Sequence, residues 1–333
     1  MPSTASQPAA TAVGSTTVDL RTGLPIALVS AAAFGLAGPL AGTMLVTGWS
    51  PAAVVAGRVG GAFLVLLIPC LFLLRRTGLP SGRQTRRMIA YGIVAVAGGQ
   101  LCYFNAVQHL SVGVALLLEY MAPVLLIGWL WLRRGQRPSA TKLVGAALSL
   151  AGLALVLDLT GEVRISLVGV AWGLSAALCL CGYFLMSERT TAAPPPLLMT
   201  TVGTGVGAVL LLLAGAIGIV PLTTASAPAL FAGHPVPWWV PMLALALVSA
   251  ALAYISGIEA VRRLGSSIAS FVALSEVILA VVFAAILLGQ IPTPVQVVGG
   301  ILILTGIAVV QTPPETLLTL VSKRPTRRRH LDA

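Results

Sequence analysis

The chain has 333 residues, of which 57% are apolar and only 9% are charged. A soluble domain carries about 25% charged residues, so this composition excludes a soluble globular protein and indicates an integral membrane protein. A net charge of +11 would also suit a nucleic-acid-binding protein. The cations flank long apolar runs, however, so we interpret them as a topology signal and expect no nucleic-acid partner.

The chain begins with a stretch rich in Ser, Thr and Ala, over residues 1–22. It lacks a basic start followed by a short apolar core, so we expect a disordered tail and not a cleaved signal peptide. Ten apolar runs follow, each long enough to cross a hydrocarbon core of ~30 Å as a helix. They lie near residues 24–47, 51–74, 88–107, 112–132, 140–157, 167–187, 196–220, 239–259, 266–288 and 294–311, and residues 312–333 form a basic tail.

The lysines and arginines predict how these runs cross the membrane. If residues 1–22 are cytoplasmic, every cation except Arg58 and Arg164 falls on the cytoplasmic side or in the basic tail. Cytoplasmic loops carry such an excess of Lys and Arg. We therefore expect a multi-pass protein of the cell (inner) membrane, with both termini in the cytoplasm. Binding of the basic tail to anionic lipid is a further option.

Residues 104–156 align with residues 258–310 without a gap, at a constant offset of 154. The alignment superposes a Gly-Gln-x-Pro turn at Gly135 and Gly289, and a Gly-x6-Gly pattern at Gly145 and Gly299. It predicts a duplicated unit of five helices, over residues 23–158 and 167–311. Because five is odd, the second copy enters the membrane upside down. Inverted repeats are typical of secondary transporters, whose substrate site lies near the membrane midplane.

Three ionisable residues lie within the apolar runs, where a charge is costly and therefore marks a functional site. Arg58 and Glu119 each lie seven residues from the outer face, roughly 10 Å deep. They form either a buried ion pair that joins two helices, or a site for the carboxylate and amine of a substrate. Glu276 lies near the midplane, where desolvation disfavours its charged form. It suits a proton carrier or a hydrogen-bonded neutral acid, and Glu119 can also exchange a proton.

Polar and aromatic residues in the same runs are weaker candidates for a substrate pocket, because such a residue alone more often joins two helices. Pro123 breaks the backbone hydrogen bonds of the fourth run one turn after Glu119, and frees a carbonyl that can line a cavity. The polar and aromatic candidates for the substrate pocket are Tyr103, Asn105, Tyr120, Trp172, Tyr183 and Tyr254.

No feature of the chain points to catalysis or to a bound metal. The cysteines lie in apolar runs without metal-ligand spacing, and the histidines lie in expected loops or in the tail. Neither lysine follows a phosphate-binding GxxxxG pattern. We therefore expect no cofactor, no metal and no enzymatic activity.

The chain resembles the EamA-type transporters of the drug/metabolite transporter superfamily over residues 24–311. The resemblance rests on the Leu118-Glu119-Tyr120-x-x-Pro123 and Ser275-Glu276-Val277 motifs, the duplicated turns and the Gly-x6-Gly helices. The fourth run looks most like the threonine/homoserine exporter branch. Gln136, Gln290 and Val277 depart from the family pattern, which often has Glu, Glu and Pro there.

The resemblance implies a central cavity lined by helices 1, 3, 4, 6, 8 and 9. Glu119 and Glu276 would line this cavity, with Tyr103 and Asn105 beside them. It implies an exporter of amino acids or related small metabolites that works by alternating access, coupled to protons or to exchange. The alternatives are an importer of the same fold, a membrane-embedded enzyme acting on lipid-linked substrate, and a non-transporting receptor or subunit. Oligomeric state is not predicted.

Overall fold

The computed structural model describes residues 19–110, 112–135, 137–157, 166–190, 193–231, 234–289 and 291–311. Most of the expected N-terminal tail and the whole C-terminal tail lie outside these residues. The same holds for Gln136, Gln290 and Arg164.

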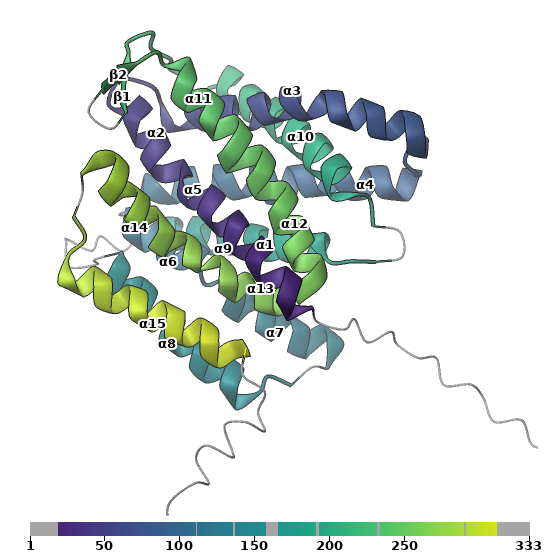
Figure 1. Cartoon of the computed structure of the whole chain (residues 1–333), viewed down its shortest axis with the longest axis vertical. Coiled ribbons are helices and arrows are strands. Elements are labelled where there is room, and N and C mark those ends of the chain that lie inside the picture. The colour runs from purple at the N-terminus through teal and green to yellow at the C-terminus, as the bar shows by residue number, and fades with distance from the viewer. Residues whose placement is uncertain are drawn as a thin grey trace, which may run out of the picture.

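Within the described residues the chain is almost entirely helical (Figure 1). The first half contains α1 Leu20–Gly35, α2 Ala37–Leu45, α3 Pro51–Thr77, α4 Gly82–Tyr91, the π-helix η1 Gly92–Gly98, α5 Gly99–Val107, α6 Val112–Glu119, α7 Ala122–Arg134 and α8 Ala140–Val156. The second half contains α9 Leu167–Ser187, α10 Pro196–Ala216, α11 Trp239–Ala246, the π-helix η2 Leu247–Leu252, α12 Ala253–Leu264, α13 Ser266–Ala273, α14 Ser275–Leu288 and α15 Pro294–Gln311.

Nine helical stretches of the described chain are long and apolar enough to span a membrane. They correspond to nine of the ten expected runs. The remaining run is α8, an apolar helix of 17 residues that is shorter than the others.

The first helix starts earlier than the sequence predicted. Leu20 is already helical, because Asp19 caps the helix by accepting hydrogen bonds from the backbone N–H of Thr22 at 3.2 Å and from its hydroxyl at 2.5 Å. Such a cap satisfies a backbone N–H that has no partner inside the helix.

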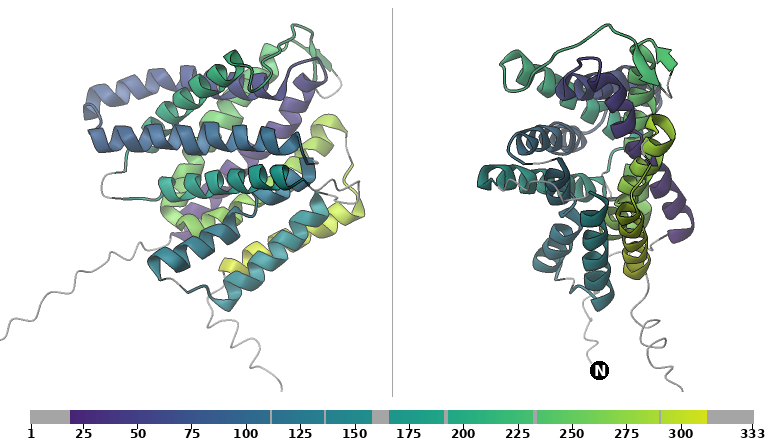
Figure 2. Two further views of the ribbon diagram at one scale, coloured as in Figure 1. Left: turned by 180° about the vertical axis from the view of Figure 1, so that it is seen from behind. Right: turned by 90° about the vertical axis from the view of Figure 1, so that its left-hand side faces the viewer.

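A short β-hairpin was not predicted from the sequence. Strands β1 Ala229–Phe231 and β2 His234–Val236 pair antiparallel between α10 and α11. The expectation of a purely helical fold was therefore wrong in this connection. In Figure 2 the hairpin lies at one end of the helix bundle.

Two spans are interrupted at equivalent positions of the two repeats. The fourth span breaks between α6 and α7 at Tyr120 and Met121, and the ninth breaks between α13 and α14 at Leu274. The offset of 154 places Tyr120 on Leu274. The same offset places η1 almost on η2, so the third and eighth spans each contain a π-helical segment at nearly equivalent positions. Such segments are rare and frequently mark functional sites.

The bundle has two chemically different ends. We call one the arginine-rich end, because the arginine-bearing ends of α3, α4, α7 and α12 lie there, together with the end of α9 and the start of α1. Hydrogen bonds join several of these segments, for example from the N–H of Asp19 to the carbonyl of Arg263 at 3.0 Å. We call the other the hairpin end. There the indole N–H of Trp49 donates to the carbonyl of Ala225 at 2.7 Å, and Gly42 of α2 lies beside Leu288 of α14.

The closing helices of the two repeats, α8 and α15, pack side by side (Figures 1 and 2). Gly145 of α8 faces the backbone of Gly306, and Gly306 faces the backbone of Gly145. Small residues at such an interface let two membrane helices approach closely.

Candidate functional site

A cavity of about 830 Å³ lies in the middle of the bundle. Every helix that was expected around it contributes lining residues, and α3 contributes as well. Its lining is exposed at the hairpin end, where Leu45, Val112 and Leu288 are 38%, 58% and 36% exposed. Near the arginine-rich end, Ala27 and Val261 are only 6% and 2% exposed. The cavity is therefore open at the hairpin end and closed at the arginine-rich end.

Arg58 lies in the eighth position of α3 and lines the cavity. Its side chain is buried, with 7% exposure, and its Nε has no hydrogen-bond partner in the described part of the chain. A buried N–H of a guanidinium without a hydrogen-bond partner is costly, so its presence in the cavity wall needs a physical reason. Its electrostatic neighbours are Glu276 and Tyr254.

Glu119 and Glu276 line the same cavity, each at a helix break. Glu119 is the last residue of α6, and Glu276 is the second residue of α14. The two carboxyl groups are close enough to interact electrostatically, and the hydroxyl of Tyr120 lies next to Glu276. Among the described residues, neither carboxylate forms an ion pair within 4.0 Å. The ion pair of Arg58 with Glu119 that we considered from the sequence is therefore absent.

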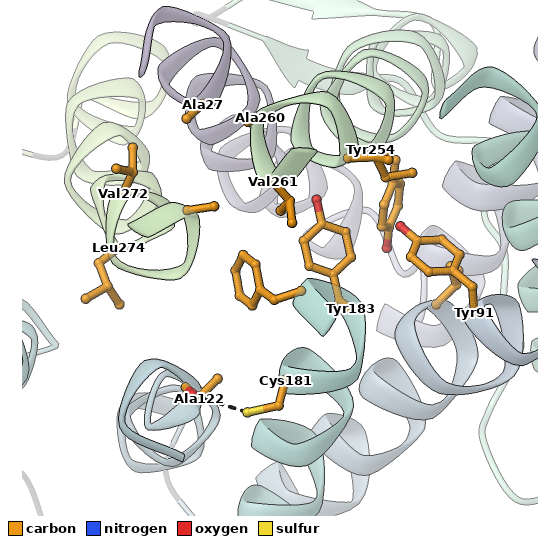
Figure 3. Packing of buried hydrophobic residues seen from close by; sticks show 14 of the residues in the cluster. Ala27, Tyr91, Ala122, Cys181, Tyr183, Tyr254, Ala260, Val261, Val272 and Leu274 are labelled. Carbon is orange, nitrogen blue, oxygen red and sulfur yellow. Dashed lines mark hydrogen bonds between the residues drawn. The ribbon is translucent and has the colours of Figure 1, made fainter. Parts of the chain in front are cut away.

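A cluster of tyrosines borders the cavity on the side of α9 and α12. The ring centroids of Tyr91, Tyr183 and Tyr254 lie 6.0–6.5 Å apart, and Phe34 stacks edge-on against Tyr254 at 5.0 Å. Figure 3 shows the three tyrosines grouped beside Val261. Tyr183 and Tyr254 line the cavity, whereas Tyr91 is fully buried behind them.

The structure brings most of the predicted site residues together. Tyr103, Tyr120 and Pro123 line the cavity with the three ionisable residues. Pro123 is the second residue of α7, directly after the break in the fourth span. There its missing N–H costs nothing, because the first N–H groups of a helix have no partner within it.

Asn105 and Trp172 do not line the cavity. The amide of Asn105 instead donates to the carbonyl of Leu101 in its own helix, at 2.8 Å. Trp172 is 38% exposed on the surface of α9. Both are polar or aromatic residues on a transmembrane helix, but they lie on faces turned away from the site.

Sequence reasoning missed three polar lining residues, Gln100, Ser30 and Ser270. Gln100 stands alone in an apolar run, which is a detectable signal. It also falls on Tyr254 at the offset of 154, so the two repeats present a polar side chain at the same place.

No three His, Cys, Asp or Glu side chains gather into a metal site within the described ranges. The cavity therefore offers hydrogen-bonding and charged groups for a small organic molecule, with aromatic rings around them.

Comparison with known proteins agrees with this geometry. The EamA-like transporter family matches the chain twice, over residues 21–158 and 167–312. The chain belongs to the EamA-like transporter family. It is therefore a multi-pass membrane transporter and not an enzyme.

The relatives of this chain include proteins named as exporters. One is a probable terminal-alkyne amino-acid exporter of Streptantibioticus cattleyicolor, 28% identical over 69% of this chain and 74% of its own length. Another is the threonine/homoserine exporter of Escherichia coli, 30% identical over 64% of this chain and 66% of its own length. A crystal structure with 18% sequence identity covers 89% of this chain and 98% of the other at a TM-score of 0.71, which shows the shared fold.

Proposed function

We propose that this EamA protein exports amino acids or related small metabolites across the cell (inner) membrane, by alternating access. Amino-acid exporters among its relatives support the substrate class and the direction. The distribution of arginines supports a cytoplasmic arginine-rich end with both termini on that side. The hairpin end then faces outward, and the cavity is open to the outside.

Ten transmembrane helices in two inverted halves, residues 23–158 and 167–311, are part of the proposal. The tenth span is α8, whose 17 residues fall at the lower limit for crossing a bilayer. Gly145 of α8 contacts Gly306 of α15, and the equivalent residues Gly299 and Gly152 contact each other in the same way. Two equivalent helices related by a two-fold axis make such a pair of contacts, which supports the inversion. Paired helix breaks at Tyr120 and Leu274 support a binding site between the halves.

One observation carries the proposal. The buried guanidinium of Arg58, whose Nε has no hydrogen-bond partner among the described residues, shares a cavity with two carboxyl groups at helix breaks. Arg58 binds the carboxylate of the substrate in two parallel hydrogen bonds, the geometry that suits guanidinium and carboxylate. Glu119 binds the ammonium group, and Glu276 takes up or releases a proton as the substrate moves. Tyr103 and Tyr120 orient the substrate through their hydroxyl groups.

The coupling mode is part of the proposal. Two buried carboxyl groups near each other cannot both be charged at low cost, so a substrate ammonium and a proton compete for them. This competition supports coupling of export to proton entry. Substrate exchange through the same cavity would need no net proton movement.

Growth of an overexpressing strain on toxic amino acids and analogues tests the proposal. Tolerance is expected with the wild type, and its loss with Glu119→Gln or Arg58→Ala at equal membrane levels. Glu259→Gln is the matched control, because Glu259 pairs at 2.7 Å with Arg263 of its own helix and does not line the cavity. Wild-type tolerance in both site variants would reject the assignment. Increased sensitivity with the wild type would indicate import.

A further inference from the structure

The carboxylate of Glu188, directly after α9, is the centre of a hydrogen-bonded cluster at the arginine-rich end. Arg134, the last residue of α7, contacts both of its oxygens, at 2.7 Å and 3.4 Å. The hydroxyl of Ser266, the first residue of α13, donates to the same carboxylate at 2.6 Å. One side chain therefore joins the ends of three spans from both repeats.

Arg87 of α4 strengthens the same junction through the backbone. Its guanidinium donates to the carbonyls of Met186 and Glu188, at 2.6 Å and 2.8 Å, and to the hydroxyl of Thr190 at 2.6 Å. The last carbonyls of a helix lack partners within it and carry partial negative charge. Two arginines from the first repeat thus hold the end of α9, which belongs to the second.

This cluster lies at the closed end of the cavity. Between the cavity and the cluster, α7 packs against α9 and α13. The Cys181 thiol of α9 contacts the carbonyl of Ala122 at 3.2 Å (Figure 3). Phe184 and Leu126 are buried there, with 3% and 0% exposure. Buried apolar side chains thus lie between the cavity and the polar cluster, which joins the helix ends.

We infer that Glu188, Arg134 and Ser266 form a latch that holds the arginine-rich end closed while the cavity is open at the hairpin end. The inference rests on the proposed alternating access. Opening toward the arginine-rich end requires α7 to separate from α9 and α13, which breaks the bonds of Glu188 to Arg134 and Ser266. Glu188 and Arg134 therefore set the ratio of the two states, although neither lines the cavity.

The environment of the cluster suits a reversible latch. The side chains of Arg134 and Glu188 are 46% and 18% exposed, so water can replace their bonds when they separate. A fully buried pair would lose too much on separation, because each charge would be left without a partner. Partial exposure allows both states to be populated.

Side-specific labelling of a cysteine in the cavity tests the latch without any substrate. Val55→Cys, which lines the cavity on α3, is introduced after the native cysteines are replaced by alanine or serine. A membrane-impermeant maleimide is then applied from the hairpin side of oriented vesicles. Arg134→Gln and Glu188→Gln are expected to slow labelling about five- to tenfold, because the hairpin-open state becomes less populated.

Arg133→Gln is the matched control, because it removes the same charge from the neighbouring position. The Arg133 guanidinium lies over the ring of Trp129 in its own helix, at 5.1 Å, and within the described residues it forms no ion pair with the second repeat. Its labelling rate should equal that of the parent. Labelling of Arg134→Gln and Glu188→Gln at the parent rate would overturn the inference.

Exchange of the two charges separates a latch from general destabilisation. Arg134→Glu and Glu188→Arg should each slow labelling, and the double variant should recover at least half of the parent rate. Slow labelling in the double variant, at parent membrane levels and thermal stability, would overturn the inference. Absence of amino-acid transport by the wild type would reject the proposed function, but it would leave this labelling result intact.

Discussion

Gly152 of α8 and Gly299 of α15 pack backbone against backbone. A Cβ atom on Gly152 would lie 2.5 Å from the carbonyl oxygen of Gly299, and a Cβ on Gly299 would lie 2.6 Å from the carbonyl oxygen of Gly152. The contact is reciprocal. Gly145 of α8 and Gly306 of α15 form a second contact of the same kind along this interface. Each closing helix therefore uses its Gly-x6-Gly pattern to approach its counterpart.

Gly152→Ala should destabilise the protein by about 1–3 kcal/mol, because the added methyl group meets a backbone atom that cannot move alone. Thermal unfolding in detergent, followed by loss of monodisperse protein, measures the effect as a lower apparent Tm. Gly128→Ala in α7 is the control, because no atom lies within 4 Å of the added Cβ. An equal apparent Tm for Gly152→Ala and the wild type would contradict the close contact.

Gly257→Ala should impair transport through Tyr183. The added Cβ would lie 2.1 Å from the Tyr183 hydroxyl and 2.8 Å from the Ser30 hydroxyl. Tyr183 is 7% exposed and packs against Tyr91 and Tyr254, so it cannot move without disturbing the cavity wall. We expect at least a fivefold loss of initial flux in proteoliposomes at unchanged membrane insertion.

A second substitution checks this explanation. Tyr183→Phe removes the atom that collides with the new methyl group, so Gly257→Ala combined with Tyr183→Phe should transport better than Gly257→Ala alone. If the double variant is as impaired as the single one, the collision with Tyr183 is not the cause.

Arg58→Lys should retain the charge but lose the fork of donors that matches a carboxylate. A hydrogen bond to a charged group contributes about 1.5–3 kcal/mol, so loss of one should raise KM at least tenfold. Initial transport rates at graded substrate concentrations measure KM. An unchanged KM for Arg58→Lys would mean that Arg58 does not hold the substrate carboxylate.

Glu276→Gln should remove the response of transport to a pH gradient, because the amide cannot exchange a proton. In proteoliposomes, acidification on the hairpin side should accelerate wild-type export and leave the variant unchanged. Glu276→Gln should still exchange labelled for unlabelled substrate. A full pH-gradient response in the variant would contradict the role of Glu276 in coupling.

Much of the fold follows from patterns that are strong in the sequence. Long apolar runs between turn residues predicted the helical spans, and the offset of 154 predicted which elements of the two halves correspond. The break near Pro123 has a local chemical cause that the sequence displays. The matching break at Leu274 has no proline, so it depends on packing and could not be predicted from the residues beside it.

The π-helical segments η1 and η2 are a similar case. Their sequences, GIVAVAG and LVSAAL, carry no pattern that distinguishes a π-helix from an α-helix, and η1 packs closely against α10. For example, a Cβ on Gly92 of η1 would lie 2.8 Å from the carbonyl of Gly203 in α10. Such contacts join residues far apart in the chain.

The sequence predicted those site residues whose side chains are chemically unusual for an apolar transmembrane run. Arg58, Glu119 and Glu276 stand out as charges in apolar runs, and all three line the cavity. Asn105 stood out as a polar residue in such a run, but its amide bonds to its own helix, and the sequence alone does not show which way a side chain points. The latch at Glu188 was not found, since charges at helix ends are common and their partners come from distant segments.

Counterflow in proteoliposomes tests the central claim most directly. Vesicles that contain purified wild-type protein are preloaded with a neutral amino acid such as threonine, and the same amino acid is added outside in labelled form. The account predicts transient accumulation of label inside the vesicles, abolished by Glu119→Gln and retained by Glu259→Gln. No accumulation with any member of a panel of amino acids, in vesicles that contain folded protein, would contradict it.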